Sequence, residues 1–173
     1  RWAASPVTRS SVDGIDAYVD DAFGACHRAH ASIVGPPQTL PSAMGLLLAK
    51  EVDVLLGLRN NPKRPFVAVL GGAKISDKLG VVEALLGVVD SLVIGGAMAN
   101  TFLAAQGHNL GQSLQEAEMH DTARAILADA KAGSCEIVLP LDLVVADEFR
   151  AHAATRIVPV DALPDGFMAL YVG

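Results

Sequence analysis

Residues 66–87 read FVAVLGGAKISDKLGVVEALLG, and the fold depends on the pattern they contain. Residues 66–72 form an apolar run that ends in two glycines, which is typical of a buried β-strand. Residues 75–87 follow with apolar side chains at helical spacing, namely Leu79, Val82, Leu85 and Leu86. A strand that leads directly into a helix is the repeating unit of a parallel sheet with crossover helices.

The same alternation continues beyond this unit. SLVIGG at residues 91–96 predicts a second strand that again ends in glycines, and residues 97–106 predict a short helix. EIVLP at residues 136–140 predicts a third strand, and two short apolar runs, LDLVVADEF and RIVPV, follow it. The alternation predicts the α/β class, with a parallel sheet and crossover helices in a Rossmann-like, three-layer arrangement.

A longer amphipathic helix is predicted at residues 113–131, SLQEAEMHDTARAILADAK. Ser113 is the expected N-cap, and Glu116 lies three residues further on. This spacing is that of a capping box, in which each side chain accepts a hydrogen bond from the other residue's backbone N–H group.

The first part of the chain lacks this alternation. IDAYVD at residues 15–20 resembles a short strand, whereas GPPQTLPS at residues 35–42 predicts a loop by its glycine and proline content. Residues 43–59 have apolar side chains at helical spacing, and NNPKRP interrupts the chain at residues 60–65. We therefore expect a domain boundary near residues 45–65, with the helix joining the two parts.

Composition narrows the class of protein. Apolar residues make up 51% and charged residues 18% of the 173 residues, which suits one domain, or one domain with a piece of another. The net charge of −6 argues against general nucleic-acid binding, and no apolar run has the length of a membrane span. The two cysteines, Cys26 and Cys135, predict no disulfide framework and favour a cytoplasmic location. The N-terminus lacks a signal-peptide pattern, and the apolar ending FMALYVG suggests a piece of a longer chain.

The turn after the first strand is a candidate phosphate site. Ligands of parallel α/β sheets bind at the carboxyl ends of the strands, where Gly71 and Gly72 allow close approach to the backbone. Lys74 follows at the expected helix start, a position that disfavours a cation, and Lys78 lies one turn further on. An anionic ligand would explain both lysines, although Lys78 could instead pair with Glu83 or face water. The stretch matches neither the Walker A pattern nor G-x-G-x-x-G.

Gly95 and Gly96 end the second strand in the same way. Glycines there would allow a flat ring, such as adenine, to lie against the backbone. A simple tight turn is the alternative, and the spacing by itself favours the turn.

The segment CHRAH, residues 26–30, is the other cluster of polar side chains. His27 and His30 could share a helix face, but metal-binding histidines on helices are usually four residues apart, so we expect no metal site. Arg28 is a better candidate, because its guanidinium suits carboxylate or phosphate and a histidine can add a donor. A solvated arginine between two solvated histidines is the alternative.

Asp20 and Asp21 directly follow the first strand-like run. Adjacent side chains on a strand point to opposite faces, so the two carboxylates would not converge on one ion or substrate. We interpret them as structural.

Taken together, the motifs resemble those of the phosphoglycerate kinase family from about residue 15 to the end of the chain. The similar stretches are YVDDAFGACHRAHAS, RPFVAVLGGAKISDKLGVVEALL, VDSLVIGGAMANTFLAAQG, EIVLPLDLVVADEF and VPVDALPDGFMAL, in the family's order. The resemblance implies a two-domain glycolytic kinase that transfers a phosphoryl group between 1,3-bisphosphoglycerate and ADP, giving 3-phosphoglycerate and ATP, with Mg²⁺. It implies a remnant of the phosphoglycerate-binding domain at residues 1–45, an interdomain helix at residues 46–60, and half of the nucleotide-binding domain at residues 61–173.

The resemblance also implies roles for individual residues. Arg28, with His27 beside it, matches the basic patch that holds the phosphoglycerate. Lys74 matches the lysine at the transferring phosphoryl group, which makes Lys74 and Arg28 the expected catalytic residues. The remaining positions at the nucleotide are Gly72, Ala73, Lys78, Gly96 and Ala97, the last in place of a family glycine.

The family's chains are about twice this length, and the aspartate that holds the metal–nucleotide complex matches no residue here. The family is usually monomeric, but open sheet edges predict that this chain self-associates. An alternative function is a non-catalytic nucleotide-binding or interaction module built from the same unit. A dinucleotide-binding Rossmann domain is a further alternative, although its glycine fingerprint is missing.

Overall fold

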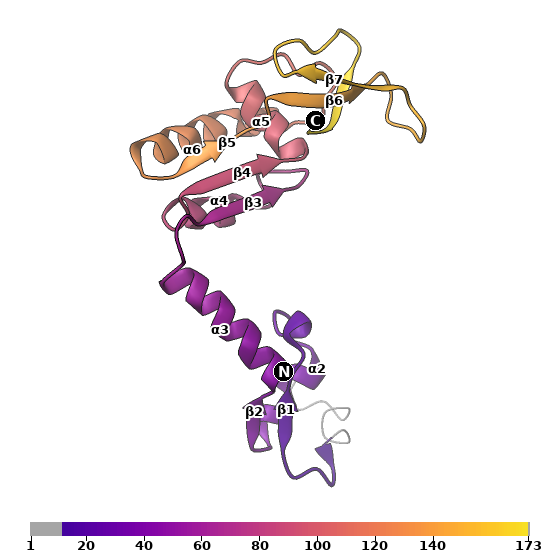
Figure 1. Ribbon diagram of the computed structural model, residues 1–173. Coiled ribbons are helices and arrows are strands. Elements are labelled where there is room, and N and C mark those ends of the chain that lie inside the picture. The colour runs from indigo at the N-terminus through magenta and orange to yellow at the C-terminus, as the bar shows by residue number, and fades with distance from the viewer. Residues whose placement is uncertain (1–11, 173) are drawn as a thin grey trace. The chain divides into compact units, whose positions relative to one another are not determined.

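The computed structural model describes residues 12–172, which form two units (Figure 1). The first unit ends at Pro62 and the second begins at Lys63. In the described residues, no helix is long and apolar enough to cross a membrane.

The first unit contains a small parallel sheet followed by a long helix. Strand β1 (Tyr18–Asp20) pairs with β2 (Ser42–Met44), and helix α3 (Leu46–Asn60) follows. Three short helices lie between the strands, namely η1 (Phe23–Ala25), α2 (Ala31–Val34) and η2 (Pro36–Gln38). The strand predicted at residues 15–20 is therefore present but shorter.

Asp21 holds the N-terminus of α3. Its Oδ1 accepts a hydrogen bond from the backbone N–H of Leu48 at 2.9 Å, which satisfies one of the free donors at the helix start. The same carboxylate fills the space beside Gly45, where an added Cβ would lie 2.3 Å from Oδ1. The structural interpretation of Asp21 is confirmed.

Helix α3 buries little of its apolar surface. Leu48 is its only buried residue, whereas Leu46 is 90% exposed and Leu55 and Leu56 are nearly half exposed. The helical spacing correctly predicted the helix. The spacing did not predict burial, because burial depends on elements that cover the apolar side chains.

A parallel three-stranded sheet forms the centre of the second unit. Strands β3 (Val67–Gly71), β4 (Ser91–Gly95) and β5 (Glu136–Val138) lie side by side in that order. Along the chain, helix α4 (Leu79–Leu86) connects β3 to β4, and helices α5 (Ala97–Ala105) and α6 (His120–Ala132) connect β4 to β5. The predicted α/β class with a parallel sheet and crossover helices is confirmed. The third layer of the predicted three-layer arrangement is not seen in the described residues, because these helices pack on one face of the sheet.

All three helices contribute to one core on one face of this sheet. The core contains Val82 of α4, Phe102 of α5 and Ile126 of α6, together with Leu92 and Ile94 of β4. On the opposite face, Val67 is 48%, Val69 78% and Val138 38% exposed. The alternation along β3 therefore separates a partly buried face, with Ala68 and Leu70 against the core, from a largely exposed apolar face.

An antiparallel sheet follows in the chain. Strand β6 (Asp142–Ala146) pairs on one side with β7 (Thr155–Pro159) and on the other with β8 (Met168–Val172). A second apolar core joins it to the end of α5, with Leu103, Leu110, Leu143 and Val145 buried together. The sequence identified the apolar runs of this region but did not predict their antiparallel pairing.

Two helices begin later than their sequences predict. Helix α4 begins at Leu79 instead of residue 75, and α6 begins at His120, preceded by η3 (Ala117–Met119). The predicted capping box is wrong, because the Ser113 Oγ instead accepts a hydrogen bond from the Ala169 N–H at 2.8 Å.

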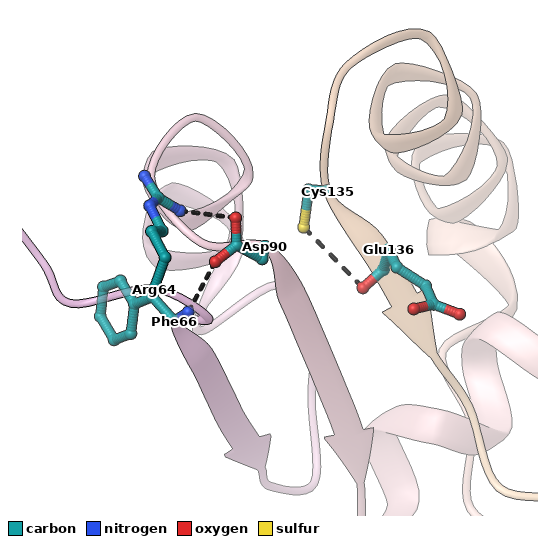
Figure 2. A network of polar contacts seen from close by, with 5 residues as sticks. All are labelled: Arg64, Phe66, Asp90, Cys135 and Glu136. Carbon is teal, nitrogen blue, oxygen red and sulfur yellow. Dashed lines mark hydrogen bonds and ion pairs between the residues drawn. The ribbon is translucent and has the colours of Figure 1, made fainter.

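Polar contacts join the strands at the amino end of the parallel sheet (Figure 2). Asp90 accepts hydrogen bonds from the backbone N–H of Phe66 at 2.6 Å and from the Arg64 guanidinium at 2.8 Å. The Asp90 carbonyl accepts from the N–H of Glu136 at 2.9 Å, and the Cys135 thiol lies 3.9 Å from the Glu136 carbonyl. Asp90 therefore connects the starts of all three strands.

Candidate functional site

The glycines at the carboxyl ends of β3 and β4 lie against each other. Gly71 is in register with Gly95, and Gly96, the residue after β4, has φ of +67°. A Cβ added to Gly96 would lie 2.9 Å from the carbonyl oxygen of Gly72, and that oxygen accepts the N–H of Met98 at 2.9 Å. Position 96 therefore requires glycine both for its backbone conformation and for the close approach of the two turns.

The loop between β3 and α4 carries both candidate lysines. Lys74 is exposed, and Lys78 is half buried at the N-cap position of α4. Lys78 folds back over Gly72, where an added Cβ would lie 2.9 Å from the lysine Cε. The prediction that Lys74 begins the helix, with Lys78 one turn further on, is wrong, because α4 begins only at Leu79. The loop nevertheless keeps both lysines next to the two glycine turns.

Neither lysine forms an ion pair within 4 Å in the part of the chain that the structure describes. The alternative in which Lys78 pairs with Glu83 is therefore not observed. A cation that has no protein partner at the carboxyl end of a parallel sheet is available to an anionic ligand.

Glu116 holds this loop, although the sequence indicated a different role for it. Its carboxylate accepts hydrogen bonds from the N–H of Ile75 at 2.6 Å, the N–H of Ser76 at 3.2 Å and the hydroxyl of Ser76 at 2.5 Å. The residue is only 7% exposed, and its own N–H donates to Thr101 Oγ1 at 3.0 Å. Glu116 therefore joins the lysine loop to helix α5.

Several effects act on the pKa of Glu116. Burial raises this pKa, but hydrogen bonds from the Ser76 hydroxyl and from the N–H groups of Ser76 and Ile75 lower it, and the charge of Lys74 lowers it further. The net result is a pKa below the ordinary value for glutamate. Glu116 is therefore a carboxylate at neutral pH, although it is buried.

A pocket of about 350 Å³ opens beside the N-terminus of α5. Its wall is largely apolar and is formed by Ala97, Gln112, Leu114, Phe149, Met168, Ala169 and Leu170. The segment that carries Leu114 is held by a hydrogen bond from Asn100 Nδ2 to the Leu114 carbonyl at 3.1 Å. The pocket has the size and surface that a flat aromatic ligand requires.

The candidate residues of the first unit lie next to each other. Arg28 Nε donates a hydrogen bond to His27 Nε2 at 3.0 Å, and both side chains are exposed. His30 lies at the N-cap position of the short helix α2 and does not share a helix face with His27. The described residues contain no group of three His, Cys, Asp or Glu side chains that could hold a metal ion.

The structure thus gathers the six second-unit candidates in one place: Gly72, Ala73, Lys74, Lys78, Gly96 and Ala97. Sequence reasoning missed the role of Glu116, which lies 40 residues or more beyond its loop partners. The sequence marked Glu116 only by its position near the start of the predicted amphipathic helix, and a local capping role explained that position equally well.

Comparisons with known proteins agree on one family. The family model described as phosphoglycerate kinase matches residues 5–173. Phosphoglycerate kinase from Frankia alni is 54% identical over 172 residues, which cover 96% of this chain and 42% of the relative. The protein of the same name from Granulibacter bethesdensis is 56% identical over 158 residues, covering 91% of this chain and 40% of the relative.

Solved structures give the same result. Phosphoglycerate kinase from Coxiella burnetii superposes with a TM-score of 0.85 at 38% identity, covering 96% of this chain and 43% of that chain. The enzyme from Pyrococcus horikoshii superposes with a TM-score of 0.77 at 28% identity, covering 94% and 41%. The chain spans about 40% of the length of these relatives. Because the family model covers nearly every residue, the chain belongs to the phosphoglycerate kinase family.

Proposed function

We propose that this chain supplies part of a phosphoglycerate kinase, an enzyme that transfers a phosphoryl group from 1,3-bisphosphoglycerate to ADP and back. The observation that carries the proposal is the site at the carboxyl ends of β3 and β4. Two closely approaching glycine turns there lie beside Lys74 and Lys78, which have no carboxylate partner within 4 Å in the described residues.

The second unit is proposed to hold ADP or ATP. The apolar pocket lined by Ala97 and Leu114 would take the adenine ring, and Gly96 directly precedes Ala97 in the chain. Gly72 and Ala73 would lie along the nucleotide, with Lys74 and Lys78 at its phosphates. The glycines leave room for the ligand near the backbone, and the lysines supply the positive charge that it requires.

The first unit is proposed to hold the phosphoglycerate. Arg28 is suited to a carboxylate or phosphate because its guanidinium donates in a planar fork, and His27 would add a further polar contact. In the reaction, a β-phosphate oxygen of ADP attacks the acyl phosphate, and the bond from that phosphorus to the C1 oxygen breaks. The products are ATP and 3-phosphoglycerate.

Positive charge is the chemistry that these residues contribute to the transfer. The transferring phosphoryl group carries its charge on three oxygens, so catalysis depends mostly on position and electrostatic stabilisation. Lys74 and Arg28 are the proposed catalytic residues on this basis. Mg²⁺ usually accompanies such nucleotides and would be held largely by their phosphates. The described residues contain no group of three His, Cys, Asp or Glu side chains that could hold a metal ion, and no step is assigned to the ion.

A chimera tests this proposal directly. This chain would replace the matching segment of the Frankia alni relative, and ATP formation would be measured in a coupled assay. We expect an active chimera in which Lys74→Ala lowers kcat by about 10²–10³-fold, because a charge at the transferring group is lost. Arg28→Ala should raise the KM for 1,3-bisphosphoglycerate about tenfold or more, as expected for a lost charge-assisted hydrogen bond.

Lys131→Ala is the matched control, since Lys131 is an exposed lysine in the last turn of α6 and should leave both constants unchanged. An inactive but folded chimera would contradict the kinase proposal. If the 173-residue chain nevertheless bound ADP, the alternative of a non-catalytic nucleotide-binding module would be favoured.

We also propose that the chain is cytoplasmic and that it self-associates. Both cysteines are free, which suits a reducing compartment. In the described residues β3 is an edge strand, and its own residues Val67 and Val69 form an exposed apolar face. Sedimentation velocity should therefore show concentration-dependent association that Val69→Thr weakens. A monomer at all concentrations would exclude self-association.

A further inference from the structure

Glu116 is a buried carboxylate to which the proposed reaction assigns no role. We infer that Glu116 is a positioning residue that fixes the loop of Lys74 and Lys78 for the phosphate chain of an adenine nucleotide. The inference rests on the proposed nucleotide site, and it adds a residue that determines the geometry of that site.

The contacts of Glu116 act at one point of the loop. Its three donors come from two consecutive residues, Ile75 and Ser76, which lie between the two lysines. The segment from β3 to α4 is neither strand nor helix, so these bonds replace the ladder that would otherwise hold it. Ile75 is fully buried in the core, and this packing fixes the same point from the other side.

Glu116 holds the loop without forming an ion pair with a lysine, although the charge of Lys74 acts on its carboxylate from a greater distance. The carboxylate accepts only from N–H and O–H groups, and it lies farther than an ion-pair distance from Lys74. Charge-assisted bonds of this kind are stronger than neutral ones. The loop is therefore held firmly, while Lys74 is left exposed for a ligand.

The other side of Glu116 is anchored to α5. Its N–H donates to Thr101, which is fully buried, and Asn100 donates to the carbonyl of Leu114 in the same segment. Leu114 lines the apolar pocket. One segment thus contacts both the lysine loop and the pocket, so Glu116 sets the position of the lysines relative to the pocket that would hold the ring.

The test compares ligands with and without phosphates. ADP and adenosine are titrated calorimetrically into the 173-residue chain and its variants. Glu116→Ala removes the acceptor, and we expect ADP affinity to fall at least about tenfold while adenosine affinity changes less than about twofold. Glu116→Gln should retain most ADP affinity, because its amide oxygen can accept both N–H groups while the Ser76 hydroxyl turns to accept from the amide.

Glu118→Ala is the matched control, because Glu118 is exposed two residues away and should bind ADP like the original chain. Equal ADP affinity in a folded Glu116→Ala variant would overturn the positioning role. Equal losses for ADP and adenosine would also overturn it, because Glu116 would then support the whole unit instead of the loop.

Two further outcomes are informative. If Glu116→Ala does not fold, Ser76→Ala removes one of the three donors and should weaken ADP about threefold with adenosine unchanged; no effect on ADP would overturn the inference. If the original chain binds ADP no better than adenosine, the proposed nucleotide site itself fails, and the inference fails with it. A chain that prefers ADP to adenosine equally with and without the Glu116 side chain would give a different result, because it would overturn only the positioning role.

Discussion

At each end of the parallel sheet β3–β4–β5, a carboxylate accepts hydrogen bonds from backbone N–H groups, but only the carboxylate at the amino end forms an ion pair. At the amino end, Asp90 accepts from Phe66 and also pairs with Arg64 (Figure 2). At the carboxyl end, Glu116 accepts only from neutral donors of Ile75 and Ser76. Arg64 is therefore paired at the amino end, whereas Lys74 and Lys78 at the carboxyl end have no ion-pair partner in the described residues.

Because of this difference, we expect the paired charges at the amino end to contribute to stability and the lysines at the carboxyl end to contribute to ligand binding. A paired cation at the start of the strands contributes to holding them together, although an exposed pair contributes little. Lysines without an ion-pair partner near the glycine turns contribute less to the fold, and their charge is useful mainly to an anionic ligand. Substitutions at the two ends should therefore affect different measurements.

The largest effect is expected from Gly96→Ala at the carboxyl end. An alanine there adopts an unfavourable positive φ, and its Cβ would meet the backbone oxygen of Gly72 at 2.9 Å. We expect the free energy of opening of the β4 amides, measured by hydrogen exchange, to fall by about 2–4 kcal/mol. ADP binding should be lost at the same time.

Gly80→Ala is the control for this substitution. Gly80 lies in the first turn of α4, and an added Cβ there meets no atom within 4 Å. The variant should be as stable as the original chain or slightly more so, because alanine favours helix. Equal effects of the two substitutions would contradict the requirement for glycine at position 96.

A smaller and more selective effect is expected from a pair of cation variants. Arg64→Ala should lower the midpoint of thermal unfolding slightly and leave ADP affinity unchanged, because it removes only the amino-end ion pair. Lys74→Ala should leave the midpoint unchanged and remove most ADP affinity. Calorimetry measures both quantities, and loss of ADP binding in Arg64→Ala would mean that the two ends do not act separately.

Local patterns were sufficient to predict much of the second unit. The apolar run at residues 66–72 and the glycines at positions 72 and 96 identified two neighbouring strand ends, and parallel pairing then brought the lysine loop beside them. The existence of α4, α5 and α6 followed from helical spacing. These features depend on residues that lie close together in the sequence, so a single sequence is sufficient to predict them.

Features that depend on distant partners were not predictable in the same way. Glu116 was assigned to a capping box with Ser113, but both side chains bond to segments 40 or more residues away. Helix α3 has the predicted spacing, yet its apolar side chains are mostly exposed. Spacing defines a face of an element, whereas the partner of that face depends on the tertiary fold.

The smallest effect concerns the response of the two carboxylates to pH. The Phe66 N–H and the Arg64 guanidinium hold the pKa of Asp90 below its usual value despite partial desolvation, and the pKa of Glu116 is also lowered. A lowered pKa in the folded state stabilises the fold at pH above about 4, the unfolded-state pKa of these groups, and this contribution disappears as pH falls through the folded-state pKa. Asp90→Asn and Glu116→Gln should therefore each make stability less dependent on pH below about 4.

Salt separates the two ends in this experiment. Asp90 is 42% exposed at its side chain and is partly held by an ion pair, whereas Glu116 is 7% exposed as a whole residue and accepts from neutral groups. Because salt screens exposed charges more than buried ones, added salt should reduce the stability difference between Asp90→Asn and the original chain. It should leave the difference for Glu116→Gln nearly unchanged. An equal response of both variants in urea unfolding would show that the amino-end ion pair contributes no separate electrostatic stability.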